Sequence, residues 1–368
     1  MDSSVFTIEK YQNDDIRAID ARFEAQKIAF APLTFQAMRA ALELGLLRQI
    51  ELSGEEGISA AELAKRLELS EYAVRLLCEI SLAMNVVKLK ADPDKELFVL
   101  GKVGFFLLND ELTRVNFNFS ADVCYEGAAK LKDSLQSGKP EGLKVFGENW
   151  HTVYEALSSL PNRQKQSWFA FDHFYSDVAF PQALPLVFDG TPTSLLVDIG
   201  GNTAKWALAC CRYNASVKVV IVDLPGQTAV AAQNAQAAGF GERVSTLSAN
   251  VLDDETRLPR GANVFWMSQF LDCFSLDQVT QIMHKVYEAA GDDTRVFVLE
   301  PLWDKQRFEG NAYSVIATSL YFACIANGCS KMYRFDELQG AIESSGLHLV
   351  AANHDLGSNA YSLLEFRK

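Results

Sequence analysis

From Ser194 to the C-terminus, short apolar runs rich in β-branched residues alternate with segments of helix length. This alternation constrains the fold most strongly, because parallel strands need a crossover connection and a helix usually supplies it. Nearly continuous apolar runs such as 217–222 are typical of central strands covered on both faces. We therefore predict an α/β domain over residues 191–368 with a mainly parallel seven-stranded sheet. The predicted strands are 194–199, 217–222, 244–247, 263–267, 295–300, 347–352 and 361–366.

The N-terminal part of the chain has helical periodicity instead. Ser59 followed by Glu62 is a capping-box pattern, and Ser70 is placed to cap the next helix. Two helices followed by two short strands indicate a mostly helical, winged-helix-like domain over residues 1–120. The strands are expected at 86–89 and 97–100, joined by a turn at 92–95.

A winged helix can bind DNA or serve as a protein–protein contact. The expected recognition helix, 70–85, offers Arg75 as a cation against Glu71 and Glu79, and the formal net charge of the chain is −13. Binding to phosphates requires clustered basic residues, so we expect no nucleic-acid partner. Segment 30–50 is predicted to be a buried helix, too apolar to face water, which favours a homodimer formed through this domain.

Residues 121–190 are predicted to form a helical connecting segment that contributes to a substrate pocket. An aromatic-lined pocket binds apolar small molecules well. The aromatic candidates are Trp150, Phe169, Phe174, Phe180, Trp266, Phe270, Phe274 and Tyr321.

Cysteine usage and targeting signals indicate the compartment. Seven cysteines without CxxC spacing predict neither a disulfide framework nor a metal site. No signal peptide and no apolar segment long enough to span a bilayer are visible, so we expect a cytoplasmic protein without a membrane partner.

Two acidic strand ends point to a cofactor. The first strand ends in Asp198, followed by the glycine pair Gly200 and Gly201, which lets the backbone approach a ligand. Asp223 ends the second strand 25 residues after Asp198, where a carboxylate can accept hydrogen bonds from ribose hydroxyls. The pair predicts a nucleoside-containing cofactor; a dinucleotide stays open, although the full G-x-G-x-x-G pattern is missing.

The motifs Val-Asp-Ile-Gly-Gly at 197–201, Asp-Leu-Pro-Gly at 223–226 and Phe-Val-Leu-Glu-Pro at 297–301 resemble the plant-type, caffeate-like O-methyltransferase family. The domain order is also similar, over about residues 30–366. The resemblance implies a winged-helix dimerisation domain before a Rossmann-like class I methyltransferase domain. It further implies transfer of a methyl group from S-adenosyl-L-methionine to a hydroxyl group, usually phenolic, by a dimer.

For the cofactor site, the resemblance implies that Asp223 binds the ribose with Leu224 beside it. The Gly-Asp pair of the family is Ala249-Asn250 here, so Asn250, with Val251 next to it, would contact the adenine. A lysine common in the family is replaced by Ser268. Asp198, Gly200 and Gly201 would complete the site, although Asn202 and Ala204 stand where the family usually has glycine.

The catalytic position departs from the family most clearly. Asp272 stands where the family has its basic histidine, and a helper Glu of the family is absent near 332–334. We expect Asp272 or His173 to accept the substrate proton and Glu300, which matches a family glutamate, to orient the site.

We therefore predict an S-adenosylmethionine-dependent O-methyltransferase acting on a hydroxylated, phenolic or conjugated small molecule. Two alternatives stay open. The chain could bind S-adenosylmethionine and catalyse other chemistry, such as decarboxylation or hydroxylation, or it could be a catalytically inactive binding protein. A DNA-binding regulator is disfavoured by the negative charge.

Overall fold

The computed structural model describes residues 6–91, 95–147, 150–157, 159–358 and 360–368. The chain forms two compact units, one comprising Tyr11–Ala121 and the other residues 6–10 together with Asp122–Lys368. Residues 6–10 were expected in the N-terminal domain, but Phe6 N–H donates to the carbonyl of Arg307 at 2.8 Å and Lys10 pairs with Glu309. The helical segment that follows residue 121 belongs to the same unit as the sheet.

The first unit is mostly helical, with one small antiparallel hairpin. Ser59 and Ser70 cap two of its helices as predicted, because their Oγ atoms accept from Glu62 N–H and Ala73 N–H, each at 3.2 Å. Residues 92–94 of the predicted hairpin turn lie outside the described residues. The elements are α1 (Ala18–Glu43), α2 (Leu46–Leu52), α3 (Ala60–Leu67), α4 (Glu71–Ala83), β1 (Val87–Leu89), β2 (Phe98–Leu100), α5 (Lys102–Asn109) and α6 (Glu111–Phe119).

The expected single buried helix over 30–50 is wrong in two respects. The chain turns after α1 because Gly45 adopts a left-handed conformation with φ of 78°, and α2 begins at Leu46. Helix α1 is also largely exposed: Phe30 and Leu33 are 54% and 68% exposed. Phe23, Ile28, Phe30 and Leu33 of α1 are thus exposed, whereas Met38 and Ala41 near its end and Leu46 and Leu47 of α2 are buried.

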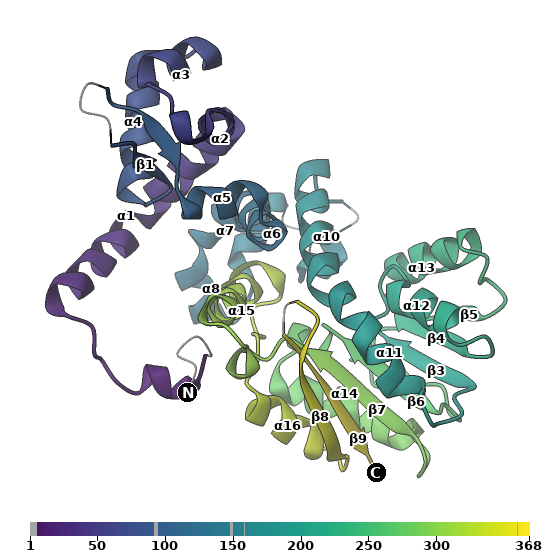
Figure 1. The fold of residues 1–368 in the computed structure, drawn as a ribbon. Coiled ribbons are helices and arrows are strands. Elements are labelled where there is room, and N and C mark those ends of the chain that lie inside the picture. The colour runs from purple at the N-terminus through teal and green to yellow at the C-terminus, as the bar shows by residue number, and fades with distance from the viewer. Residues whose placement is uncertain (1–5, 92–94, 148–149, 158, 359) are drawn as a thin grey trace. The chain divides into compact units, whose positions relative to one another are not determined.

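The second unit contains the predicted seven-stranded sheet, preceded by short helices (Figure 1). The strand order is β5-β4-β3-β6-β7-β9-β8; β9 pairs antiparallel with both β7 and β8, and the other neighbouring strands pair in parallel. The strands are β3 (Leu195–Ile199), β4 (Lys218–Asp223), β5 (Val244–Ser248), β6 (Val264–Ser268), β7 (Arg295–Glu300), β8 (His348–Leu356) and β9 (Tyr361–Arg367). The helices are α7 (Tyr125–Ala128), α8 (Leu131–Ser137), α9 (Val153–Ala156), α10 (Asn162–Ser176), α11 (Phe180–Phe188), α12 (Lys205–Tyr213), α13 (Pro225–Ala237), α14 (Leu276–Ala289), α15 (Glu309–Tyr321) and α16 (Phe335–Glu343).

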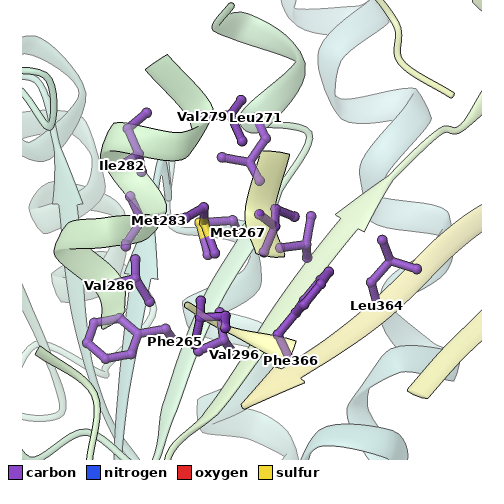
Figure 2. Close-up of a cluster of buried hydrophobic side chains, with 14 of the residues drawn as sticks. Phe265, Met267, Leu271, Val279, Ile282, Met283, Val286, Val296, Leu364 and Phe366 are labelled. Atoms are coloured by element: carbon purple, nitrogen blue, oxygen red, sulfur yellow. The ribbon is translucent and has the colours of Figure 1, made fainter. Parts of the chain in front are cut away.

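Side chains alternate between the two faces of the sheet, so each face has its own core. Figure 2 shows one of them, where α14 contributes Val279 and Ile282 against Phe265 and Met267 of β6. On the opposite face, Trp266 stacks on Trp206 of α12 with ring centroids 3.7 Å apart. These two cores hold the carboxyl ends of the parallel strands in one row, where a ligand can bind.

A buried ion pair attaches α11 to the sheet. The Arg295 guanidinium donates to both carboxylate oxygens of Glu365 at 2.9 Å, and to the carbonyls of Leu186 and Val187 at 2.9 Å. Arg295 and Glu365 are each only about a tenth exposed at the side chain.

No helix in the described part of the chain is both long and apolar enough to cross a bilayer.

We expect Glu365→Ala to lower the free energy of unfolding by about 3–5 kcal/mol, because Arg295 would stay buried without its carboxylate. Urea unfolding followed by circular dichroism measures this loss. The control is Glu309→Ala, which removes a pair with Lys10 that is more than half exposed and should cost under about 1 kcal/mol. Equal losses for the two variants would show that the Arg295 pair does not stabilise the sheet.

Candidate functional site

A cavity of about 470 Å³ opens at the carboxyl ends of β3, β4 and β6. One end is formed by loops of the sheet, and the other by α9, α10, α15 and the segment after β6. The lining residues are His151, Thr152, Tyr154, Glu155, Leu157, Trp168, Phe171, Asp172, Gly200, Asn202, Val222, Asp223, Leu224, Gln227, Ala249, Asn250, Val251, Leu252, Gln269, Phe270, Asp272, Cys273, Phe274, Gln278, Tyr321, Phe322, Asn327 and Cys329.

Asp223 lines this cavity at the end of β4, and its carboxylate is held by backbone donors. Asn202 N–H donates to its Oδ2 at 2.9 Å, and Leu224 N–H donates to its Oδ1 at 2.7 Å. Burial raises the pKa of Asp223, while these two N–H groups act to lower it. The carboxylate is thus fixed in orientation and still faces the cavity.

The glycine turn after β3 lies next to Asp223. Gly200 has φ of 77°, and a Cβ atom at this position would overlap the Phe270 ring. A Cβ on Gly201 would lie 2.7 Å from Asp198 Oδ2. Both glycines are therefore required by close approaches within the protein, and Gly200 also lines the cavity.

Asp198 lies beneath this turn and does not line the cavity. It is 1% exposed, and its Oδ2 has no hydrogen-bond partner among the described residues. Burial, followed by the nearby charge of Asp223, raises the pKa of Asp198 to about 8. Asp198 is therefore a largely neutral carboxyl group beneath the turn and presents no charge to a ligand in the cavity.

Of the other four expected cofactor residues, three line the cavity and one does not. Leu224, Asn250 and Val251 line the cavity, and Ser268 does not; the adjacent Gln269 takes its place. Asn250 is exposed, and its carboxamide accepts from Leu252 N–H and donates to Asp253, each at 3.0 Å. Its side chain therefore builds the turn after β5 as well as part of the cavity wall.

Two further carboxyl groups are buried near this cavity: Asp272, in the segment after β6, and Glu300, at the end of β7. Asp272 is 2% exposed and lines the cavity, and its Oδ2 has no partner among the described residues. Burial raises the pKa of Asp272 to about 7, while a hydrogen bond from Cys273 acts to lower it. At neutral pH this carboxyl group can both accept and release a proton.

Glu300 lies behind this segment and outside the cavity lining. Its Oε1 accepts from Phe270 N–H at 3.0 Å and from Leu271 N–H at 2.8 Å. Burial and then the charge of Asp272 raise the pKa of Glu300 well above its ordinary value. Glu300 therefore positions the backbone that carries Asp272.

Helix α10 presents Asp172, not His173, to the cavity. Trp168, Phe171 and Asp172 share one face of the helix and line the cavity, whereas His173 is rotated by about 100° from its neighbour. His173 instead stacks on Phe169 with ring centroids 5.9 Å apart, and burial lowers its pKa. Asp172 Oδ2 accepts from Asn202 Nδ2 at 3.0 Å.

The sequence reasoning missed Asp172, Asn202 and Tyr154 as cavity residues. The helical period of Trp168, Phe171 and Asp172 is a signal that could have identified Asp172. Of the eight aromatic candidates, three line the cavity, and Phe180 and Trp266 pack together in the core against Trp206. The three that line it are Phe270, Phe274 and Tyr321.

The described residues contain no group of three or more His, Cys, Asp or Glu side chains that could hold a metal ion.

Two family models match the chain: a Dimerisation2-like domain over residues 22–95 and an O-methyltransferase domain over residues 129–341. The second match covers more than half of the sequence.

Individual proteins show the same similarity. The L-tyrosine C(3)-methyltransferase of Streptomyces lavendulae is 24% identical over 324 residues, which is 87% of this chain and 85% of that protein. Acetylserotonin O-methyltransferase of Bos taurus is 22% identical, over 73% of this chain and 77% of that protein. Among solved structures, the S-adenosylmethionine-dependent methyltransferase SibL in its apo form matches with a TM-score of 0.69 and 22% identity, covering 93% of this chain and 98% of that one.

We expect Gly200→Ala to destabilise the protein more than Gly190→Ala. Both glycines have φ near 76°, which costs an alanine about 1–2 kcal/mol. Gly190 has open space around its Cβ position, whereas Gly200 faces Phe270, so overpacking should add about 1–3 kcal/mol. Urea unfolding of both variants measures the difference. Equal destabilisation would mean that Phe270 moves away at no cost.

Proposed function

Because the chain belongs to the O-methyltransferase family and is an S-adenosylmethionine-dependent methyltransferase, we propose that it methylates a hydroxylated aromatic small molecule inside this cavity. One observation carries the proposal: a buried carboxyl group, Asp272, with a pKa of about 7, lines an aromatic-walled cavity beside the glycine turn. Both relatives described above are named for substrates that contain a hydroxylated aromatic ring.

The residues present fit the cofactor. Asp223 supplies an oriented carboxylate with remaining lone pairs, which suits the two hydroxyl groups of a ribose. Leu224, Val251 and Leu252 offer apolar surface beside it for an adenine ring, with the amide of Asn250 at the edge. We propose that these residues hold the nucleoside half and that the turn at Gly200 holds the methionine half.

Bound S-adenosylmethionine supplies an activated methyl group on a sulfonium. Asp272 would accept the proton of the acceptor hydroxyl, so that the oxygen can attack as a phenolate-like nucleophile. Tyr321, Trp168 and Phe171 would orient the aromatic ring, and alignment of donor and acceptor contributes much of the rate. We assign the proton to Asp272 and not to His173, because Asp272 lines the cavity and His173 does not.

Glu300 would act as a positioning residue. Its two hydrogen bonds to the backbone before Asp272 fix the direction of the carboxyl group. Its raised pKa favours the neutral acid, which limits repulsion when Asp272 is ionised.

Methylation of the ring carbon beside the hydroxyl is a second candidate, favoured by the name of the Streptomyces lavendulae relative. Removal of the phenolic proton also increases electron density at that carbon. The two products have the same mass, and carbon NMR of the product distinguishes an O-methyl from a C-methyl group.

We also propose that the protein is a cytoplasmic homodimer. The match to a Dimerisation2-like domain and the exposed apolar side chains of α1, including Phe23, Ile28 and Leu33, support the dimer. All seven cysteines are free thiols, which is the form that a reducing compartment maintains.

Asp223→Ala should weaken binding of S-adenosylhomocysteine by about 10- to 100-fold, because two charge-assisted hydrogen bonds are lost. Isothermal titration calorimetry measures the change. Asp254→Ala, which removes an exposed acid outside the cavity lining, serves as the control and should bind as the wild type does. Unchanged affinity in Asp223→Ala would disprove the proposed position of the ribose.

The rate of methyl transfer should rise as the pH increases through about 7 and level off above 8, because only ionised Asp272 accepts a proton. Asp272→Asn should lower kcat by about 100-fold or more and remove the inflection. Since burial and nearby acids raise the pKa of Asp172 to about 7 as well, Asp172→Asn is the necessary control and must keep the inflection. A pH profile that Asp272→Asn leaves intact would exclude Asp272 as the base.

A further inference from the structure

The cavity is acidic along its wall. The described lining residues include four carboxyl side chains and neither lysine nor arginine; the one basic side chain is His151, which is exposed. The four acids are Glu155, Asp172, Asp223 and Asp272. An acceptor that carries a carboxylate would enter this cavity without a counter-charge, which is unfavourable at low dielectric constant.

Asp172 is the acid that the proposed chemistry does not use. It lies on α10 with its side chain about 22% exposed, close to the glycine turn through its bond with Asn202. Burial raises its pKa to about 7, and the charges that raise it further are all acidic: Asp272, Asp177 and Asp223. Two basic side chains lie nearby but outside the cavity lining: His173, whose Nδ1 is 4.0 Å from Asp172 Oδ2 and whose pKa is lowered by burial, and Lys205, which pairs with Asp177 at 3.4 Å.

Asp272 supplies an independent sign of a ligand. Asp272 is only 2% exposed and lines the same cavity. Its Oδ2 has no hydrogen-bond partner among the described residues. A buried polar atom without a partner is costly unless a ligand or water satisfies it. Asp172 on α10 and Asp272 after β6 line the same cavity, and the charge of Asp272 raises the pKa of Asp172. A ligand between the two carboxyl groups can therefore contact both.

We propose that the methyl acceptor is a hydroxylated aromatic amine, whose ammonium group binds Asp172 while its hydroxyl group lies at Asp272. The proposal rests on the proposed function and names the substrate class of the same site. A cation offsets the repulsion between the two carboxylates, and a charge-assisted hydrogen bond to a buried carboxylate is stronger than one between neutral groups. Asp172 thus becomes a residue that determines specificity, separate from the proton acceptor.

An ammonium group could also come from the methionine half of the cofactor, because Asn202 belongs to the glycine turn. The acceptor and the cofactor would both present an ammonium group to Asp172, but removal of the Asp172 charge gives a different result in each case. If Asp172 binds the acceptor, Asp172→Asn alters the preference among acceptors and leaves cofactor affinity unchanged. If Asp172 binds the cofactor, Asp172→Asn lowers the cofactor affinity and leaves the preference among acceptors unchanged.

The test uses calorimetry on the full chain saturated with S-adenosylhomocysteine at pH 8, where both carboxyl groups are ionised. The probes are matched triplets of an amine, a neutral compound and an acid on one scaffold, such as tyramine, 4-ethylphenol and 4-hydroxyphenylacetate, with equivalent sets on naphthol and hydroxyindole. The wild type should bind an amine about 10- to 100-fold more tightly than its neutral counterpart. The acid of the same triplet should bind most weakly.

Asp172→Asn should remove this preference and keep the affinity for S-adenosylhomocysteine. The control is Asp177→Asn, which removes a nearby acidic charge outside the cavity lining and should keep the preference. The proposal is overturned if no amine binds more tightly than its neutral counterpart. It is also overturned if Asp172→Asn weakens the binding of S-adenosylhomocysteine and leaves the preference for the amine over the neutral compound intact. Failure of the proposed function would differ from both, because the wild type would then bind no S-adenosylhomocysteine.

Discussion

The arrangement of the cavity depends on one buried carboxyl group, Glu300, at the end of β7. Its Oε1 accepts two backbone hydrogen bonds from Phe270 and Leu271 and so fixes the segment that follows β6. The Phe270 ring then occupies the space beside Gly200, so the segment and the glycine turn fit against each other. A single side chain outside the cavity thereby sets the positions of the residues on two of its walls.

Burial gives this site its acid–base range. The resemblance to the caffeate-like O-methyltransferases implies a histidine at the position of Asp272, and an unperturbed histidine titrates near neutrality. The Asp272 carboxyl group reaches a pKa of about 7 because it is removed from water. A buried aspartate can therefore act as a proton acceptor at the same pH as an exposed histidine, because desolvation raises the pKa of the carboxyl group to the ordinary pKa range of histidine.

The sheet was predictable because hydrophobic pattern, strand spacing and strand-end acids depend on local sequence. The caps at Ser59 and Ser70 were predictable for the same reason. The cavity was predictable in part, at strand ends such as Gly200 and Asp223 and at the aromatic candidates Phe270, Phe274 and Tyr321. Asp172 was missed because its place in the cavity depends on which face of α10 meets the glycine turn. The exposure of Phe30 and Leu33 on α1 was missed because an apolar sequence does not show whether another element covers the helix.

Asn202 contacts both ends of the cavity. Its backbone N–H donates to Asp223, and its side-chain amide donates to Asp172. A ligand that shifts this residue from one end alters a hydrogen bond at the other end, so the two binding free energies are linked, and such linkage is reciprocal. The asparagine that interrupts the glycine-rich turn thus couples the two ends of the cavity, so that a ligand at one end changes the binding free energy of a ligand at the other.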